Sequence, residues 1–342
     1  MKAPSTAISV LVAVAVTAAW APPARADTSA DFYKAKNITM IIATGAGGGY
    51  ALASQILARH MPKYIPGKPT IVLQYMPGGG GQKAHDYVYN VAPRDGYTIA
   101  MPSDGIALAQ RLRKVKYDAK EFNALGRMER SPDVFALMSR AGIKSFAEAK
   151  AAPSIVVMAT AKSSVSYMNA MLAKELLKLP LKIVLGYSGT STGLLAMEKG
   201  EIDGWVWVWP TIEQKKPDWL RDGKIHILAQ VGLHRLPELS DVPLMQELTS
   251  DPDDQALLRF MASKVEIGRH HSTPPGFPKP QLAMLRRAYM ATLKDPAFIA
   301  EAKQRKLSLA PLDGEGVQKV YDGMIDAPEA LVARMKKILG YN

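Results

Sequence analysis

The 342-residue sequence contains no cysteine. This absence excludes disulfide bonds, zinc–thiolate and iron–sulfur sites, cysteine nucleophiles and a lipid anchor attached through cysteine. Internal repeats and low-complexity linkers are also missing, which excludes solenoid and beads-on-a-string architectures. We also expect no metal and no other cofactor.

The sequence also lacks a concentrated basic segment, although Lys+Arg 43 against Asp+Glu 31 gives a formal net charge of +12. The basic residues are scattered singly or in pairs such as Lys215-Lys216 and Arg286-Arg287. Nucleic-acid binding usually needs a basic arm or stripe, so we expect no nucleic-acid partner. A diffuse positive field favours small anions, including carboxylates.

Long hydrophobic runs are confined to the N-terminus, where Ala7 to Trp20 follows Lys2 and precedes Ala24-Arg25-Ala26. A short apolar stretch before an A-x-A motif is typical of a cleavable signal peptide, here residues 1–26. The alternative, an uncleaved anchor helix, is disfavoured because the stretch is short and ends in Pro22-Pro23. We expect a protein that is soluble outside the cytoplasm and monomeric after cleavage.

Strand-like and helix-like segments alternate along the first part of the mature chain. The expected strands are 37–43, 70–75 and 97–101, and the expected helices are 50–61 and 82–91. The order βαβαβ predicts a parallel sheet with right-handed crossovers.

A second unit of the same kind follows, opened by a strand at 134–138 and a short helix with a capping box at Ser145 and Glu148. Its further strands are expected at 155–159, 182–185, 205–208 and 225–230, and its helices at 166–178 and 192–199. Four helical patterns then close the chain, at 281–294, 296–306, 316–325 and 328–339, and are expected to return to the first lobe.

This pattern predicts an α/β fold with two lobes, each a mainly parallel sheet flanked by helices. The expected division is 27–132 with 232–342 for lobe 1, and 133–231 for lobe 2. Because the chain crosses between lobes near 127–133 and 230–233, we expect a hinge there.

Two glycine clusters follow the first two strands. Gly45 to Tyr50 (GAGGGY) joins a strand to a helix, where N–H groups and the helix dipole favour an anion. This first cluster lacks the third glycine of the Rossmann fingerprint. The second cluster, Gly78 to Lys83 (GGGGQK), lacks the spacing of a phosphate loop, so neither cluster indicates a nucleotide. The alternative for the first cluster is a tight turn without a ligand.

Gly189 to Gly193 (GTSTG) matches the G-x-S-x-G pattern of serine hydrolases, with Ser191 at its centre. A triad would need a later acid and histidine, and the candidates for the histidine are His226, His234, His270 and His271. No His-Gly-Gly-Gly oxyanion motif precedes Ser191, and the same small residues suit ligand binding. A secreted esterase thus stays open as the alternative function. We interpret His270-His271 as part of a surface loop rather than a metal site.

A third polar turn, Thr160 to Ser166, also joins a strand to a helix, so its hydroxyl and N–H groups suit an anion. The alternative is an ordinary N-cap at Ser164 or Ser166. Trp205, Trp207 and Trp209 alternate along a strand and point to one face, which favours core packing but also allows a cleft wall.

Several stretches in order resemble the extracytoplasmic solute receptors of tripartite tricarboxylate transporters, the Bug family. They are TGAGGGY (44–50), QYMPGGGGQKA (74–84), APRDGYTIAMPSDG (92–105), ATAKSSVSYM (159–168), VLGYSGTSTGLLAMEKGEIDG (184–204), LHRLPELSDVPLMQEL (233–248), and then TPPGFPKPQLAMLRRAY and KDPAF.

The resemblance implies a two-lobed Venus-flytrap receptor of periplasmic-binding-protein fold, located in the periplasm of a Gram-negative cell. Such a receptor performs no chemistry, closes on a small di- or tricarboxylate or aromatic carboxylate, and hands it to membrane permease subunits. It nominates the first glycine loop, the Ser/Thr loop and the inner edge of lobe 2 as ligand contacts. With Ser103 and Trp207 added, the candidate residues are Gly47, Gly48, Gly49, Tyr50, Ser103, Thr160, Ser163, Ser164, Ser166, Tyr187, Gly189, Thr190 and Trp207.

One position departs from the family pattern, because Ala51 stands where members usually carry Asp. Removing a fixed negative charge beside an anion site favours a more anionic or more apolar ligand over amino acids. We further expect Ser164 to donate its hydroxyl or N–H to the ligand carboxylate, with Ser272 in a surface loop.

Overall fold

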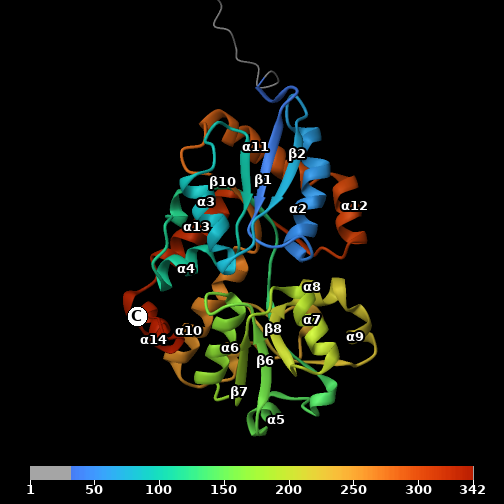
Figure 1. Cartoon of the computed structure of the whole chain (residues 1–342), viewed down its shortest axis with the longest axis vertical. Coiled ribbons are helices and arrows are strands. Elements are labelled where there is room, and N and C mark those ends of the chain that lie inside the picture. The colour runs from blue at the N-terminus through green and yellow to red at the C-terminus, as the bar shows by residue number, and fades with distance from the viewer. Residues whose placement is uncertain (1–31, 342) are drawn as a thin grey trace, which may run out of the picture.

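The computed structural model describes residues 32–341, so the expected signal peptide at 1–26 lies outside the described residues. Two lobes lie one above the other, each built around its own sheet (Figure 1). We call the part around the six-stranded sheet the first lobe and the part around the five-stranded sheet the second lobe.

The first sheet has the strand order β11-β4-β10-β3-β1-β2. β1 pairs in parallel with both β2 and β3, and β10 is antiparallel to β3 and β4, so four of the six strands run one way and β10 and β11 the other. The strands are β1 (Asn37–Ile42), β2 (Thr70–Tyr75), β3 (Thr98–Met101), β4 (Asn123–Glu129), β10 (Arg269–Thr273) and β11 (Leu309–Asp313).

The second sheet has the order β7-β6-β8-β5-β9. β6 is parallel to β7 and β8, whereas β5 is antiparallel to β8 and β9. The strands are β5 (Asp133–Met138), β6 (Ile155–Ala159), β7 (Leu181–Leu185), β8 (Gly204–Val208) and β9 (Ile225–Val231). Both sheets are therefore mixed rather than mainly parallel as expected, because β10 and β11 add antiparallel pairings to the first sheet and β5 adds them to the second.

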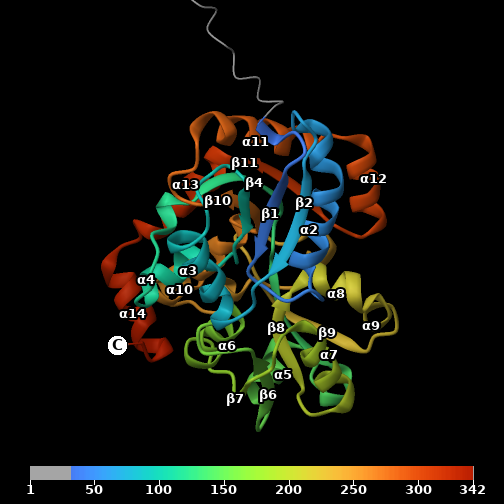
Figure 2. The same cartoon turned by 45° about the horizontal axis from the view of Figure 1, so that its top comes forward.

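Helices cover both faces of each sheet. On the first sheet, α11 and α2 pack against one face and α13 and α4 against the other, and α12 lies beside α2 (Figure 2). The helices are α2 (Gly49–His60), α3 (Gln82–Asn90), α4 (Ile106–Leu112), α5 (Phe146–Ala151), α6 (Val165–Glu175), α7 (Thr190–Lys199), α8 (Trp209–Lys215), α9 (Pro217–Arg221), α10 (Pro252–Ala262), α11 (Lys279–Thr292), α12 (Pro296–Gln304), α13 (Gly314–Ile325) and α14 (Glu329–Leu339).

Strand β1 shows why the sheet is covered on both sides. Ile38, Met40 and Ile42 belong to one hydrophobic cluster, while Ile41 belongs to another on the opposite face. Because side chains alternate across a strand, this near-continuous apolar run reads as a strand buried on both faces.

Strand β10 corrects one expectation. His270, His271 and Ser272 do not lie in a surface loop but in β10, in the middle of the first sheet, and all three are fully buried. His270 contacts the hydroxyl of Tyr321, and His271 Nδ1 lies 3.2 Å from the hydroxyl of Tyr289. These neutral polar contacts allow two histidines to be buried without a metal or a charge.

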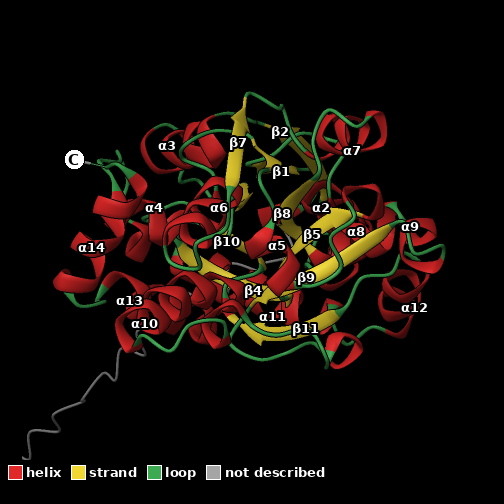
Figure 3. Ribbon diagram, turned by 90° about the horizontal axis from the view of Figure 1, so that it is seen from below, coloured by secondary structure: helices red, strands yellow, loops and turns green. Residues whose placement is uncertain are grey.

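The chain passes from the first sheet to the second between Glu129 and Asp133 and leaves the second sheet after Val231. The tail helices do not all return to the first lobe, since α14 lies against α6 of the second lobe as well as α4 (Figure 3). Within residues 32–341, no helix has the length and apolarity required to cross a membrane.

Candidate functional site

Three helices begin immediately after parallel strands, at the edges where the two lobes meet. α2 follows β1, α6 follows β6, and α7 follows β7, with Gly48, Ser164 and Gly189 as their N-caps. None of the three has an acidic residue in its first turn, and neither α2 nor α7 has a side chain bonded to its free N–H groups from the N-cap. Positive helix ends without a carboxylate form a ready anion site.

The starts of α2 and α7 face each other across the lobes. A Cβ atom at Gly47 would lie 3.4 Å from Ser191 Oγ, and one at Gly48 would lie 4.0 Å from Thr190 Oγ1. The predicted residues Gly47, Gly48 and Thr190 are therefore brought together, and Gly189 directly precedes Thr190. The two lobes approach each other closely at this point.

The second glycine cluster meets the Ser/Thr loop. Gly80 has φ +68°, and a Cβ there would lie 3.0 Å from the backbone oxygen of Ser163. Only glycine adopts this conformation at no cost while letting the two backbones approach. Ser163 thus faces Gly80 in this structure.

A buried arginine, which the sequence analysis missed, lies under the start of α2. Any side chain at position 49 would collide with the guanidinium of Arg269, whose carbon lies 6.0 Å from the ring centre of Tyr50. Arg269 pairs with the buried Glu129 and donates from Nη2 to Thr211 Oγ1 at 3.2 Å, which links the first lobe to α8 of the second. Its Nε is buried without a hydrogen-bond partner among the described residues.

A buried ion network forms a second link between the lobes. Lys264 Nζ lies 2.9 Å from Asp104 Oδ2, in the loop after β3, and 2.7 Å from Asp133 Oδ2, at the start of β5. Asn169 of α6 donates to the same Asp133 oxygen at 2.8 Å. Burial alone would lower the pKa of Lys264, but attraction to the two carboxylates outweighs it and raises that pKa. The ammonium therefore stays charged where the chain crosses between lobes.

Tyr50 and Ser103 belong to this region but use their polar atoms locally. The hydroxyl of Tyr50 accepts from the N–H of Asp104 at 3.1 Å, and burial raises its pKa well above the usual value. The N–H of Ser103 donates to His85 Nε2 at 3.1 Å, and its hydroxyl lies 3.4 Å from the oxygen of Gly80. Both residues hold the glycine loops in place.

Ser164 is nine-tenths buried and acts as the N-cap of α6. Its hydroxyl accepts from the N–H of Tyr167 at 3.3 Å and donates to the oxygen of Ala161 at 2.7 Å. Its N–H donates to the same Ala161 oxygen at 3.0 Å. Ligand contact through Ser164 therefore stays a prediction that requires the loop to rearrange. Thr160 and Ser166 are partly buried, and Ser166 Oγ lies 3.0 Å from Ser164 Oγ.

The tryptophans pack in the core of the second lobe. Trp205 and Trp207 stack with ring centres 4.8 Å apart, and Trp207 is 4% exposed. Tyr187 packs against the same cluster and is partly exposed. Trp207 thus has little surface to offer a ligand, whereas Tyr187 retains some.

The hydrolase pattern at Ser191 lies at the start of α7, as its sequence context requires. No hydrogen bond from Ser191 to a histidine is present among residues 32–341, and His270 and His271 are enclosed in β10. Ser191 instead faces Gly47 of the other lobe. This placement resembles a ligand contact more than a nucleophile with a general base.

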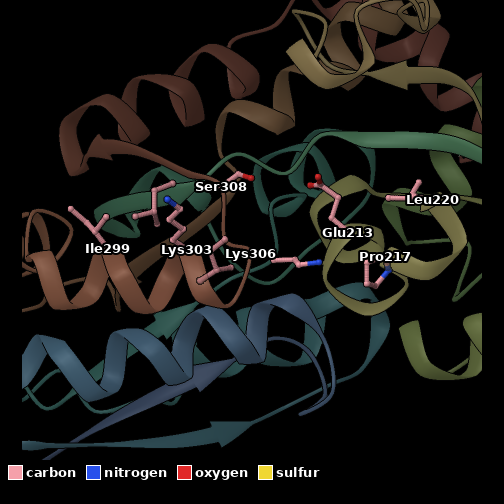
Figure 4. Close-up of a pocket in the computed structure, with 9 residues that line it drawn as sticks. Glu213, Pro217, Leu220, Ile299, Lys303, Lys306 and Ser308 are labelled. Carbon is pink, nitrogen blue, oxygen red and sulfur yellow. The ribbon is translucent and has the colours of Figure 1, made fainter. Parts of the chain in front are cut away.

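A pocket of about 530 Å³ opens between the lobes on the side of α12, with Glu213 of α8 facing Lys306 and Ser308 (Figure 4). Burial, with added repulsion from Glu238 and Glu129, raises the pKa of Glu213 to about 7. The wall also contains Lys303 and Lys306, so the pocket carries groups of both signs, whereas the helix starts offer only positive ends.

The signals for Arg269 and Thr211 were weak in the sequence. Arg269 lies in a five-residue strand of polar residues, RHHST, which no hydrophobic periodicity marks. Thr211 lies in a seven-residue helix that begins with Trp209 and Pro210. The proline in the first turn was the one sequence signal for a helix at this position. The contact between Arg269 and Thr211 depends on the tertiary structure and has no local sequence signal.

The family model described as "Tripartite tricarboxylate transporter family receptor" matches residues 52–320. A curated protein of Cupriavidus necator, named UPF0065 protein in gbd 5'region, is 25% identical over 233 residues, which cover 65% of this chain and 67% of that protein.

Solved structures share the fold over nearly the whole chain. The periplasmic binding protein BugD is 22% identical with a TM-score of 0.72, covering 90% of this chain and 98% of its own. Rpa4515 of R. palustris, solved with adipate, is 21% identical with a TM-score of 0.69, covering 89% and 97%. MatC of Rhodopseudomonas palustris, solved with bound malate, is 20% identical with a TM-score of 0.68, covering 89% and 99%. The two-lobed periplasmic-binding-protein fold expected from the sequence is confirmed.

Proposed function

Because this chain belongs to the tripartite tricarboxylate transporter receptor family, we propose that it captures a small carboxylate in the periplasm and delivers it to the membrane permease subunits of such a transporter. Two structural relatives whose names include a dicarboxylate, adipate or malate, agree with this ligand class. The proposed ligand contacts are the candidate residues named from the sequence. Ser191 and Arg269, which lies beneath the first glycine loop, are added to them.

The facing helix starts carry the proposal. Each helix N-terminus has about half a positive charge, and two of them pointing at one gap repel each other unless an anion lies between them. The first turns of α2, α6 and α7 contain no acidic side chain that would supply this charge. A ligand carboxylate completes the arrangement, with charge-assisted hydrogen bonds of about 1.5 to 3 kcal/mol each.

The residue at position 51 bears on ligand class. Ala51 lies in the first turn of α2 and is 1% exposed, so no carboxylate there competes with the ligand or binds an ammonium group. We propose a dianion or an apolar acid rather than an amino acid. The ammonium of an amino acid would face three positive helix ends.

A thermal-shift screen tests the proposal. Di- and tricarboxylates and aromatic acids are compared with their methyl esters, which lack the charge. A cognate acid at about a hundred times its Kd should stabilise the protein by about 2.7 kcal/mol, and its ester should not. Small-angle scattering should show a smaller radius of gyration with that acid, through the hinges near 127–133 and 230–233. If no acid shifts the midpoint, while ester turnover occurs and disappears in Ser191→Ala, the hydrolase alternative is correct.

A matched pair of variants locates the site. Gly48, the N-cap of α2, has an extended backbone with φ −105°, which other residues also adopt. Asp and Asn are both favourable N-cap residues, so neither substitution should disrupt the helix. Gly48→Asp adds a fixed carboxylate at the start of α2 and should abolish the ligand shift, while neutral Gly48→Asn should retain more of it. Equal binding by both variants and the wild type would place the ligand elsewhere.

A further inference from the structure

A groove on the second lobe is not used by the proposed ligand site. It lies between α6 and β7, has a volume of about 500 Å³, and we call it the α6–β7 groove. Its lining combines apolar side chains with three lysines. The residues are Lys162, Tyr167, Met171, Lys174, Leu181, Lys182, Ile183 and Leu185.

One wall of the groove is an open sheet edge. β7 ends the strand order β7-β6-β8-β5-β9, so its outer side has no strand partner in the described part of the chain. Leu185 on this strand is 41% exposed, which is high for a leucine in a sheet. An edge strand with exposed apolar residues is a template for strand addition.

The charge of the groove has one sign. Lys162, Lys174 and Lys182 are exposed, and none of the three forms an ion pair within residues 32–341. The acidic neighbour on α6, Glu175, is not among the lining residues. The two edge strands of the first sheet, β2 (TIVLQY) and β11 (LAPLD), carry no lysine, so Lys182 distinguishes the edge at β7 from those two edges.

We propose that the α6–β7 groove binds an extended acidic segment of a partner protein, which adds as a strand to β7. Its backbone would pair with the free edge of β7. Apolar side chains on the α6 side would contact Tyr167, Met171 and Ile183. The carboxylates that alternate with them would lie beside Lys182 on the other face, and Lys162 and Lys174 would add to the attraction from the α6 side. A second copy of this chain fits poorly, because two β7 edges would bring Lys182 side chains together.

The groove adjoins the proposed ligand loop. Lys162 directly precedes Ser163 and Ser164, and its backbone oxygen accepts from the hydroxyl of Tyr341 at the C-terminal end of the chain. A partner seated in the groove would therefore contact the loop that starts α6. If the protein delivers a ligand as proposed, a partner at this position could distinguish the ligand-bound protein from the empty one, because it would contact a loop of the ligand site.

Binding of a labelled peptide tests the inference on the full mature chain. The probe is an eight-residue peptide that alternates Glu with Val, measured by fluorescence anisotropy. Amide hydrogen exchange should show new protection at 181–185. Each exposed ion pair contributes about 0.2 to 1 kcal/mol, so Lys174→Glu with Lys182→Glu should weaken binding about tenfold. The control, Lys294→Glu with Lys303→Glu, makes the same charge change at exposed positions of the first lobe and should bind nearly as wild type.

Three results would overturn the inference: no binding up to about 1 mM peptide, equal weakening by both double variants, or equal binding of a peptide of the same length that alternates Glu with Pro. The last would mean general attraction without strand addition, because proline cannot pair along an edge. The assay contains no carboxylate ligand, so its failure leaves the thermal-shift screen as a separate test.

Discussion

Replacing Lys264 with Met should destabilise the protein strongly, because this ammonium separates two buried carboxylates. Lys264 is fully buried, and Asp104 and Asp133 are 5% and 2% exposed. Met has a similar length and no charge, so Lys264→Met leaves the two carboxylates facing an apolar group. Asp133 would keep the hydrogen bond from Asn169, whereas the contact of Nζ with the oxygen of Ser131 at 3.4 Å would be lost.

Removing one partner of a buried ion pair costs about 3 to 5 kcal/mol. The pH dependence gives a second signature. Burial already raises the pKa of Asp133, and losing Lys264 should raise it further. A carboxyl group whose pKa is raised on folding destabilises the protein as pH increases through that pKa. The deficit of Lys264→Met should therefore be larger at pH 8 than at pH 5.

Urea denaturation of the ligand-free protein at both pH values measures this effect. Lys264→Met with Asp133→Asn should recover part of the loss, because one buried charge is removed, and the exposed Lys303→Met serves as the control. A loss below about 1 kcal/mol, within the range of a surface ion pair, would refute the reasoning. So would a loss that does not change between pH 5 and pH 8.

Two further predictions concern Ser164 and the buried histidines. Ser164→Ala should lower the free energy of unfolding by about 0.5 to 2 kcal/mol, because α6 loses its N-cap. The exposed Ser250→Ala is the control in denaturation. A tenfold or greater loss of ligand affinity with unchanged stability would instead establish that Ser164 contacts the ligand. Burial lowers the pKa of His271 to about 3, and a pKa lowered on folding contributes stability that is lost as pH falls below the unfolded value of about 6.5. His271 should thus cost about 2 kcal/mol of stability at pH 5 relative to pH 8, and His271→Gln should reduce the pH dependence while exposed His234→Gln should not. Equal pH dependence in wild type and His271→Gln would contradict that assignment.

Elements with strong periodicity could be predicted from the sequence. β2 and β6 have the expected bounds, and α7 ends at Gly200 in the left-handed conformation expected of a glycine C-cap. The three loops between strand and helix were also identified, because glycine and Ser/Thr clusters follow apolar runs. These features depend on residues that are neighbours in the sequence, so the sequence alone is enough to predict them.

The strands that were not predicted depend on long-range pairing. β4, β10 and β11 were not predicted, because their sequences NALGRME, RHHST and LAPLD carry no clear alternation. RHHST became a strand because β3 and β4 lie on both sides of it, not because of intrinsic propensity. The buried pair of Arg269 with Glu129, 140 residues apart, could not be seen without that strand.

The position of β10 has a consequence for how the chain folds. All strands of the second sheet lie within residues 133–231, whereas the centre of the first sheet waits for a strand at Arg269–Thr273. Closing so long a loop is entropically costly, so contacts local in sequence form sooner. We expect the second lobe to gain protection from hydrogen exchange before the first during refolding, which pulse labelling would measure. During synthesis the N-terminal strands of the first sheet would then remain available to chaperones until the later half of the chain has emerged.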